Sequence, residues 1–271
     1  MSRRQDFFAA GMVFLLICLT AGAGVAGTIT LYYPPEWKAK PPEAKAIADA
    51  LSQSSGLAIQ PRIAESYPEM IAAFSKGDPV LVYVGSFVQA LLHARGLSVP
   101  LAQAKDGKEF YTSVLISPAP VGTDPAGIVR EAKDLVSYSK GTSSGESGAK
   151  AATDGAASVA ANNHGAAVNA MKAGKAKCAF VKSWWWEGNR GNFPGMNQFT
   201  YPDVSDKKHP DNVLSANKAV SAAEQTKIKE AASKNSAAFK VSGFSDFDAA
   251  LLEPTLSLMK KGKIDPKAYS W

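Results

Sequence analysis

A serine-rich loop offers the densest set of hydrogen-bonding groups in the chain. Residues 141–148 read Gly-Thr-Ser-Ser-Gly-Glu-Ser-Gly and carry four hydroxyls beside several backbone N–H groups. The loop leads into a predicted helix, and a helix N-terminus attracts phosphate-like anions without needing a cationic side chain. Helix capping is an equally good interpretation, because Ser143 is followed three residues later by Glu146. Both hold if Ser144 and Ser147 face a ligand.

Glu146 sets a condition on this interpretation, because a carboxylate repels an oxyanion. Either its side chain points away as a cap, or it pairs with an amine on the ligand. His164 stands at the start of a later predicted helix, where the imidazole can donate to an oxyanion or serve as a cap. The loop and this histidine are therefore the first candidates for an anion site.

A cation and a run of aromatic residues follow a later predicted strand. Lys182 can supply a full positive charge or lie in solvent. Trp184, Trp185 and Trp186 either wall a binding cleft or pack one part of the protein against another, which is the commoner use of large aromatic side chains. Both interpretations stay open on the sequence alone.

No set of catalytic or metal-binding groups accompanies these residues. The sequence pairs no cysteine with a histidine, and the loop 141–148 lacks the closing Gly-Lys-Ser/Thr of a Walker motif. The histidines His93, His164 and His209 form no cluster with cysteines or carboxylates at metal-ligand spacing. We therefore expect a binding protein rather than an enzyme, with no metal and no cofactor.

Alternating strands and helices must position these groups. The hydrophobic pattern predicts strands at 28–33, 57–63, 80–84, 109–117, 135–138, 178–181 and 212–216, and helices at 42–52, 68–74, 87–94, 126–133, 149–161, 165–173, 222–233 and 247–260. This alternation predicts an α/β fold with largely parallel sheets. Ligands bind beyond the carboxyl ends of such strands, where we expect the loops 33–35, 65–67 and 85–86.

Two segments are predicted to cross between lobes. The β-rich stretch 109–117 would leave the first lobe, and the strand 212–216 would return to it. We therefore expect the first lobe to consist of residues 28–113 and 217–271, with the second lobe, 114–216, inserted into it.

The chain begins like an exported protein. Arg3 and Arg4 precede a mostly apolar run from Phe7 to about Ala23, and small residues follow through Gly27. This is the layout of a secretory signal, residues 1–27, with cleavage before Thr28 and a second possible cleavage site after Ala23. A retained membrane anchor is the alternative, although the run is short for a spanning helix.

Charge and cysteine content narrow the partners. The formal net charge is +6, which suits an anionic ligand or an acidic surface. The basic residues are scattered, so the sequence does not indicate nucleic-acid binding. Without the signal, Cys178 is the only cysteine, which excludes an internal disulfide.

Five segments, in this order and at this spacing, resemble the phosphonate-binding-protein family of periplasmic transporter components. They are ESYPEM at 65–70, VYVGSF at 82–87, GKEFYTSVLI at 107–116, SSGESG at 143–148 and HGAAVNAMKAGKAKCAFV at 164–181. The resemblance implies a type 2 periplasmic-binding fold, in which two α/β lobes with mixed sheets are joined by two crossing strands. The ligand would lie in the cleft between the lobes.

The resemblance also implies roles for individual residues. The family binds its oxyanion through a Ser-Thr-Ser-Gly run, which aligns with either 142–145 or 145–148, and its histidine matches His164. A family tyrosine matches Tyr67, whereas Val84 stands where the family has another tyrosine, with Tyr83 one residue earlier. The acidic or polar group of the family falls near Lys182 and Ser183.

We expect a monomeric periplasmic solute-binding protein that captures phosphate, phosphite or a phosphonate for an ABC permease. Alternatives are a ligand-sensing partner of a membrane histidine kinase, and a binder of an organic cation or of another oxyanion such as arsenite. The expected ligand-binding residues are Tyr67, Ser86, Tyr111, Ser143, Ser144, Glu146, Ser147, His164, Lys182 and Trp184.

Overall fold

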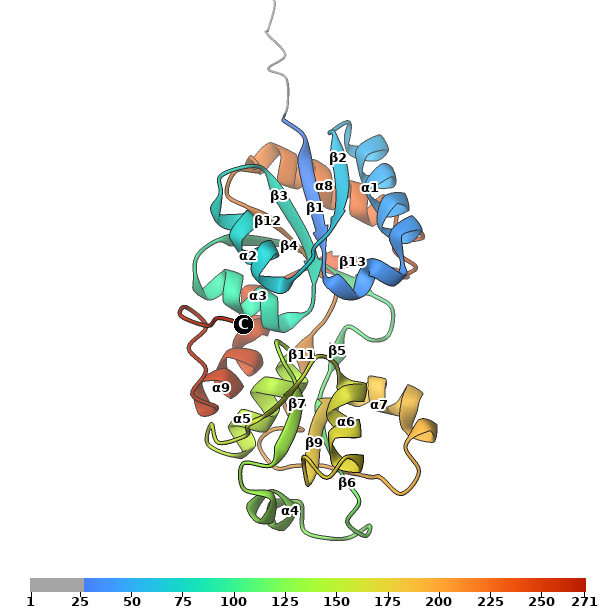
Figure 1. The fold of residues 1–271 in the computed structure, drawn as a ribbon. Helices are drawn as coiled ribbons and strands as arrows, with labels where there is room; N and C mark the ends of the chain where they lie inside the picture. The colour runs from blue at the N-terminus through green and yellow to red at the C-terminus, as the bar shows by residue number, and fades with distance from the viewer. Residues whose placement is uncertain (1–26) are drawn as a thin grey trace, which may run out of the picture.

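The computed structural model describes residues 27–271, which form two α/β lobes stacked one above the other in Figure 1. The predicted secretory signal, residues 1–27, lies outside the described residues except for Gly27. Within the described part of the chain, no helix is both long and apolar enough to cross a membrane.

The first lobe is built on a six-stranded mixed sheet with the order β13-β4-β12-β3-β1-β2. Its strands are β1 (Ile29–Tyr33), β2 (Ile59–Ile63), β3 (Val80–Val84), β4 (Ser98–Lys105), β12 (Val213–Asn217) and β13 (Gly243–Asp246). Its helices are η1 (Pro35–Ala39), α1 (Pro41–Ser55), α2 (Tyr67–Ser75), α3 (Ser86–Ala94), α8 (Ala222–Lys234) and η4 (Ala249–Leu252). Strands β1, β2 and β3 are parallel, and β12 runs antiparallel between β3 and β4.

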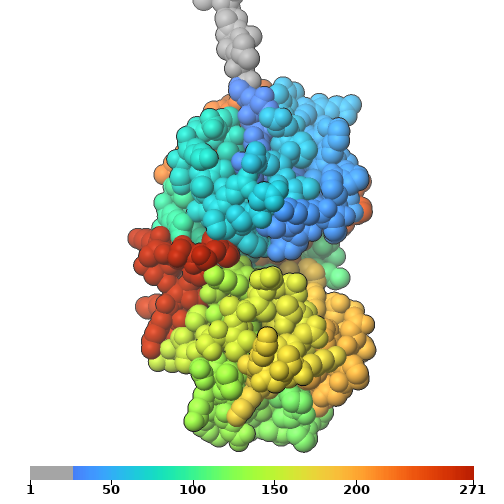
Figure 2. Space-filling model, viewed as in Figure 1, coloured from blue at the N-terminus to red at the C-terminus, as the bar shows by residue number. Residues whose placement is uncertain are grey.

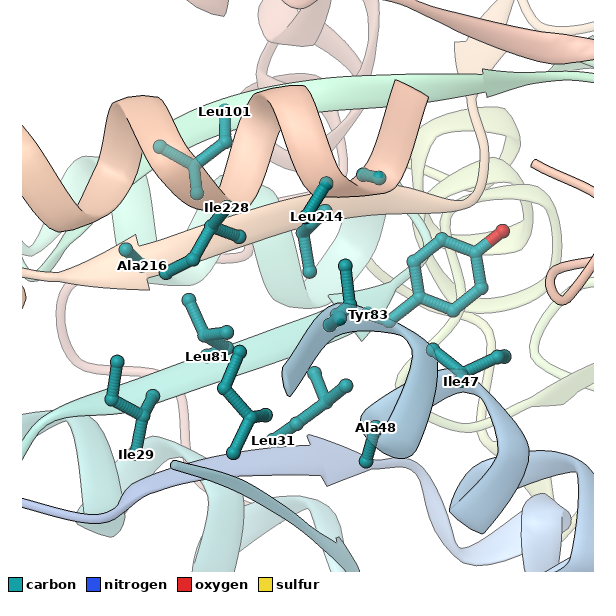
Figure 3. Close-up of a cluster of buried hydrophobic side chains, with 14 of the residues drawn as sticks. Ile29, Leu31, Ile47, Ala48, Leu81, Tyr83, Leu101, Leu214, Ala216 and Ile228 are labelled. Carbon is teal, nitrogen blue, oxygen red and sulfur yellow. The ribbon is translucent and has the colours of Figure 1, made fainter. Parts of the chain in front are cut away.

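Apolar side chains cover both faces of this sheet. All five residues of β3 are buried, as expected for a continuous apolar strand packed on both sides. On one face, Leu31 and Leu81 pack with Ile47 of α1 and Ile228 of α8 (Figure 3). On the other face α2 and α3 supply a second cluster. The sheet is thus packed on both faces up to the edge where its strands end between the lobes.

The second lobe repeats the plan with a five-stranded mixed sheet of order β10-β6-β9-β7-β8. Its strands are β6 (Ser113–Ser117), β7 (Val136–Ser139), β8 (Val159–Ala161), β9 (Cys178–Lys182) and β10 (Asn197–Phe199). Its helices are α4 (Pro125–Ala132), η2 (Ser143–Ser147), α5 (Gly148–Ala152), α6 (His164–Lys172), α7 (Ser183–Asn189) and η3 (Arg190–Asn192). Strand β7 is parallel to β8 and β9, and β6 is antiparallel to β9. The predicted α/β fold with two lobes and mixed sheets is confirmed. The expectation of largely parallel sheets, taken from the alternation of strands and helices, is wrong, because β12 and β6 run antiparallel to both of their neighbours.

A short two-stranded ribbon joins the lobes. Strand β5 (Phe110–Tyr111) pairs antiparallel with β11 (His209–Pro210), so the predicted crossing at 109–117 is divided between this ribbon and β6. The returning segment crosses at β11, and the strand predicted at 212–216 is β12 of the first sheet. We therefore propose that the second lobe ends before Val213 rather than at 216.

The end of the chain makes a second connection between the lobes. Helix α9 (Glu253–Lys261) packs against α3 of the first lobe and α5 of the second. Residues 262–271, here called the C-terminal tail, follow it. Together with α9 they form the red region of Figure 2, which lies against both lobes. The Arg95 side chain donates to the carbonyl oxygens of Pro266 (3.0 Å) and Tyr269 (2.7 Å). The tail is thereby fastened to α3.

The predicted helix at 149–161 is wrong beyond its first turn. Helix α5 ends at Ala152, because Asp154 (φ 50°) and Gly155 (φ 89°) adopt left-handed conformations that stop a helix. The Thr153 hydroxyl accepts a hydrogen bond from the N–H of Ala157 (2.8 Å), which holds the turn. The last residues of the alanine-rich stretch form β8 instead.

Candidate functional site

A cavity of about 510 Å³ lies between the lobes, where strands of both sheets end. Pro34 follows β1, Gly85 follows β3, and Lys182 ends β9, as expected for ligand sites at the carboxyl ends of parallel strands. The first lobe contributes Pro34, Glu36, Trp37, Lys40, Tyr67, Tyr83, Val84, Gly85, Phe87 and Val88; the ribbon and the residues beside it contribute Tyr111, Asp211 and Asn212; the second lobe contributes Gly141, Thr142, Ser144, His164, Lys182, Trp184 and Trp185.

The serine-rich loop forms the start of a helical segment. Residues 143–147 form one π-helical turn, a feature frequent at functional sites, and α5 continues from it. Thr142 is the cap: its hydroxyl accepts from the N–H of Gly145 (3.1 Å) and donates to the carbonyl of Ser139 (2.8 Å). The predicted pairing of Ser143 with Glu146 as a capping box is therefore wrong by one residue.

The serines of this segment have different surroundings. Ser144 lines the cavity, and its buried hydroxyl has no hydrogen-bond partner among the described residues. Ser147 is also buried without a partner in that part of the chain, but it is not one of the residues that line the cavity. The segment thus presents Ser144 to the cavity and holds Ser147 behind it.

Ser143 belongs to a chain of three hydrogen-bonded hydroxyls that connects the two lobes and the ribbon. The Ser86 hydroxyl lies 2.8 Å from the Ser143 hydroxyl and 2.8 Å from that of Tyr111. Tyr111 lines the cavity, whereas Ser86 and Ser143 are fully buried beside it. Residues 141–145 fit a Gly-x-Ser-x-Gly pattern, but the partner of Ser143 is a serine rather than an imidazole. The chain of hydroxyls links first lobe, ribbon and second lobe and does not activate a nucleophile.

The Glu146 carboxylate is turned toward the C-terminal tail. It accepts hydrogen bonds from the N–H of Gly141 (2.7 Å) and from the hydroxyl of Tyr269 (2.8 Å). Glu146 is 4 % exposed and is not among the residues that line the cavity. Of the two interpretations that the sequence allowed, this geometry matches the side chain that points away from the ligand.

His164 lines the cavity from the N-terminus of α6, where the side chain of Asn163 caps the helix. Burial, with the nearby positive charge of Lys182, lowers the pKa of His164 to about 3. The imidazole is therefore neutral at pH 7 and carries one N–H. Its Nδ1 is buried and has no partner among the described residues, so His164 offers a hydrogen bond rather than a charge.

Lys182 is held by the residues around it. Its Nζ lies 2.7 Å from Asp211 Oδ2, and 3.8 Å and 4.2 Å from the ring centroids of Trp184 and Tyr111. The tryptophan run divides its roles, because Trp184 lines the cavity while Trp186 is 3 % exposed in the core of the second lobe. Both interpretations of the run hold, each for a different residue.

The first lobe supplies an aromatic wall. The Tyr67 hydroxyl donates to Glu36 (2.9 Å), and the Tyr67 ring stacks on Trp271 of the tail at a centroid distance of 5.4 Å. Burial and the Glu36 charge raise the pKa of Tyr67 well above its usual value, so the hydroxyl stays protonated. Trp37 packs edge-on against Tyr83, and both line the cavity.

Several cavity residues have no counterpart in the sequence-based site, among them the charged and aromatic residues Glu36, Trp37, Lys40 and Asp211. Asp211 lies next to the ribbon, at the returning crossing that the sequence does indicate, so that position was the available signal. Glu36 and Trp37 lie in the short helix η1, which the pattern does not predict.

The lining can bind an anion through neutral donors. Ser144 Oγ, His164 Nδ1 and Trp184 Nε1 are buried polar atoms of cavity residues without partners in the described structure. Buried polar groups are normally hydrogen-bonded, so such atoms at a cavity indicate a ligand that carries acceptors. Across residues 27–271, no group of three or more His, Cys, Asp or Glu side chains is placed to hold a metal ion.

Two α/β lobes that enclose a ligand-sized cavity define the class of two-lobed periplasmic solute-binding proteins. The family model described as ABC transporter, phosphonate, periplasmic substrate-binding protein matches residues 42–252. The chain belongs to this family, whose members bind solutes for a transporter and are not enzymes.

Solved structures share the fold. PhnD1 of Prochlorococcus marinus in complex with methylphosphonate aligns with a TM-score of 0.66 at 13% identity, covering 89% of this chain and 100% of that one. A binding protein component of an ABC phosphonate transporter from Pseudomonas aeruginosa aligns at 0.63 and 16% identity, covering 87% of each chain. A Xanthomonas citri protein bound to chloride ion aligns at 0.68 and 12% identity, covering 87% of this chain and 97% of that one. A comparison with curated proteins finds no match.

Proposed function

We propose that this protein captures a small phosphorus oxyanion, a phosphonate above all, in the interlobe cavity and delivers it to an ABC permease. The carrying observation is that Ser144, His164 and Trp184 line one cavity and that each has a buried polar atom without a partner among the described residues. An anion buried without donors is very costly, so donors gathered in this way favour an anionic ligand. The family membership and the methylphosphonate held by a relative of the same fold support the phosphorus class.

The charges of the lining favour recognition by hydrogen bonds. Glu36 and Asp211 balance Lys40 and Lys182, so the formal charge of the lining is close to zero. A neutral site holds an anion through oriented donors and through the N-terminal end of the segment that begins at Ser143. The proposed ligand contacts are Ser144, His164, Trp184 and Tyr111. The role proposed for the other polar residues is to hold the serine-rich segment in place without contacting the ligand; these residues are Ser86, Ser143, Glu146 and Ser147.

We propose further that the protein works as a monomer in the periplasm, after export through the signal at residues 1–27. The family supports an ABC permease as the partner. Neighbouring genes test this assignment, because permease and ATPase genes would support it and a histidine kinase gene in their place would contradict it.

Isothermal titration calorimetry tests the ligand. Purified protein is titrated with methylphosphonate, phosphite, phosphate and arsenite, and we expect binding of at least one of the three phosphorus compounds. The double variant Ser144→Ala/His164→Ala is the matched control and should bind that ligand about 100-fold more weakly. Wild-type protein that binds none of the four compounds would exclude oxyanion capture.

A further inference from the structure

The ammonium group of Lys182 is surrounded by one carboxylate and two aromatic rings of the protein. Its Nζ lies 2.7 Å from Asp211 Oδ2, 3.8 Å from the ring centroid of Trp184 and 4.2 Å from that of Tyr111. The side chains of Lys182 and Asp211 are 17% and 9% exposed, so water screens the group little. A carboxylate with two aromatic faces is the set of contacts that proteins use to bind organic ammonium ions.

This ammonium cage, formed by Tyr111, Trp184 and Asp211, belongs to the ligand cavity. All three residues and Lys182 line the cavity together with Ser144 and His164. A Cβ added at Gly85 would stand 2.8 Å from Asp211 Oδ1, so the carboxylate fits closely between Gly85 and Lys182. A ligand held by the donors of the second lobe therefore shares the cavity with this cage. The negative charge of the cage, on Asp211, is already paired with Lys182.

We propose that Lys182 is a specificity-determining residue, because its own ammonium group occupies the cage where the ammonium group of a ligand would otherwise bind. By doing so it disfavours phosphonates that carry an ammonium group and selects oxyanions whose substituent is uncharged or absent. A ligand ammonium would have to displace Lys182 from Asp211 or lie beside a like charge, and such repulsive elements discriminate between similar ligands. This inference rests on the proposed oxyanion site and narrows its substrate class.

A pair of phosphonates of equal size tests the discrimination. Propylphosphonate and 2-aminoethylphosphonate differ by a methyl group in place of an ammonium. We expect wild-type protein to bind propylphosphonate at least tenfold more tightly, measured by calorimetry. In Lys182→Ala the preference should fall at least tenfold or invert, because Asp211 is then free to pair with the ligand ammonium. Equal affinities in wild-type protein, or an unchanged ratio in the variant, would overturn the proposal.

The variant Lys182→Ala/Asp211→Asn is the matched control. It removes both charges of the pair and should lose the gain for 2-aminoethylphosphonate that Lys182→Ala shows. A gain that persists in the double variant would come from added space rather than from the carboxylate, and would contradict the assignment of the cage.

Ethylammonium chloride tests the cage without any phosphonate. In thermal unfolding, it should raise the Tm of Lys182→Ala and leave wild-type protein and Lys182→Ala/Asp211→Asn unchanged. If it does so while wild-type protein binds no phosphorus oxyanion, the proposed function fails and the cage stands. Equal Tm shifts in all three proteins, beside normal oxyanion binding by wild-type protein, would overturn the cage alone. Poor folding of Lys182→Ala that ethylammonium corrects, where an equal concentration of sodium chloride does not, also supports the cage.

Discussion

The two walls of the cavity differ in how far their polar groups are already satisfied. On the second-lobe wall, the buried atoms Ser144 Oγ and His164 Nδ1 have no partner among the described residues. On the first-lobe wall, the Tyr67 hydroxyl already donates to Glu36, and Trp37 packs against Tyr83. The difference indicates that the second lobe holds the anion while the first lobe covers it with aromatic surface.

Contacts between the walls fix their separation in this structure. The Ser86 hydroxyl of α3 is hydrogen-bonded to the Ser143 hydroxyl of the second lobe at 2.8 Å. The ribbon β5–β11 lies beside this contact, and short connections of this kind act as hinges in domain closure. We therefore expect the second lobe to bind the ligand and the first lobe to close over it. Substitutions on each wall can test this difference.

The largest expected effect comes from removing donors of the second-lobe wall. A hydrogen bond to a charged ligand contributes roughly 1.5–3 kcal/mol, so Ser144→Ala and His164→Ala should each weaken oxyanion binding by about tenfold or more. If the two effects add, the double variant should bind about 100-fold more weakly, and a departure from that value would measure the coupling of the two groups through one ligand. Calorimetry with the ligand that binds wild-type protein best gives these values.

Ser147→Ala is the matched control for Ser144→Ala. Both serines are buried in the same segment and both hydroxyls lack partners in the described structure, but only Ser144 lines the cavity. Ser147→Ala should change affinity less than threefold. A loss as large as that of Ser144→Ala would mean that the ligand reaches further into the segment than the cavity does.

The next effect is on the stability of the second-lobe wall. The Tyr269 hydroxyl donates to Glu146, whose buried carboxylate also accepts from the Gly141 N–H at the head of the serine-rich loop. Tyr269→Phe leaves that charge with one donor fewer and should cost roughly 1.5–3 kcal/mol of unfolding free energy. Urea denaturation measures this cost.

Tyr201→Phe serves as the reference for Tyr269→Phe. The Tyr201 hydroxyl donates to the carbonyl oxygen of Ala152 at 3.2 Å, which is a longer bond to an uncharged acceptor. Its loss should cost about 1 kcal/mol. Equal losses in the two variants would show that the tail contributes no special support to the loop.

Elements with a clean pattern were predictable from the sequence. The continuous apolar run Val80–Val84 and the spacing of Ile47 and Leu51 both correspond to the elements observed. Strand β4 was missed because Pro100 and Gln103 interrupt its apolar residues, and because it gains its partner β12 from a segment more than 100 residues away. Local pattern carries no information about such pairing.

The candidate site was predictable in part from residue types at the ends of predicted strands and helices. Residue types alone indicated Ser144, His164 and Lys182 as site residues, and all three line the cavity. What Lys182 contacts was not predictable, because Asp211 comes 29 residues later and reaches it only through the folded ribbon. The contact of Glu146 with Tyr269 spans 123 residues and has no local signal at all.

Acid should weaken the fold through a histidine that lies behind the walls. His209 of the ribbon is fully buried, its Nδ1 lies 2.9 Å from the Thr255 hydroxyl, and burial lowers its pKa to about 3. An unfolded chain binds a proton at this residue below about pH 6.5, whereas the folded protein does not until about pH 3. The stability contributed by neutral His209 is therefore present above pH 6.5 and is lost as pH falls toward 3.

Urea denaturation at pH 7 and pH 5 measures this loss. For a group with these pKa values, linkage gives a decrease of about 2 kcal/mol between the two pH values. His209→Asn keeps a polar atom near the Nδ1 position but cannot titrate, so its pH dependence should be smaller than that of wild-type protein by about that amount. An unchanged pH dependence would assign acid sensitivity to other groups, among them His164 of the second-lobe wall.

The smallest effect is expected on the first-lobe wall, at Tyr67. Its hydroxyl already donates to Glu36, and its ring stacks on Trp271. We therefore expect the ring, rather than the hydroxyl, to contact a ligand. Tyr67→Phe keeps the ring and should change oxyanion affinity less than threefold, whereas Tyr67→Ala removes wall area and should weaken it more. If Tyr67→Phe costs as much as Ser144→Ala in the same calorimetric assay, the hydroxyl turns to the ligand on closure and both walls hold it. The division between a holding lobe and a covering lobe would then be wrong.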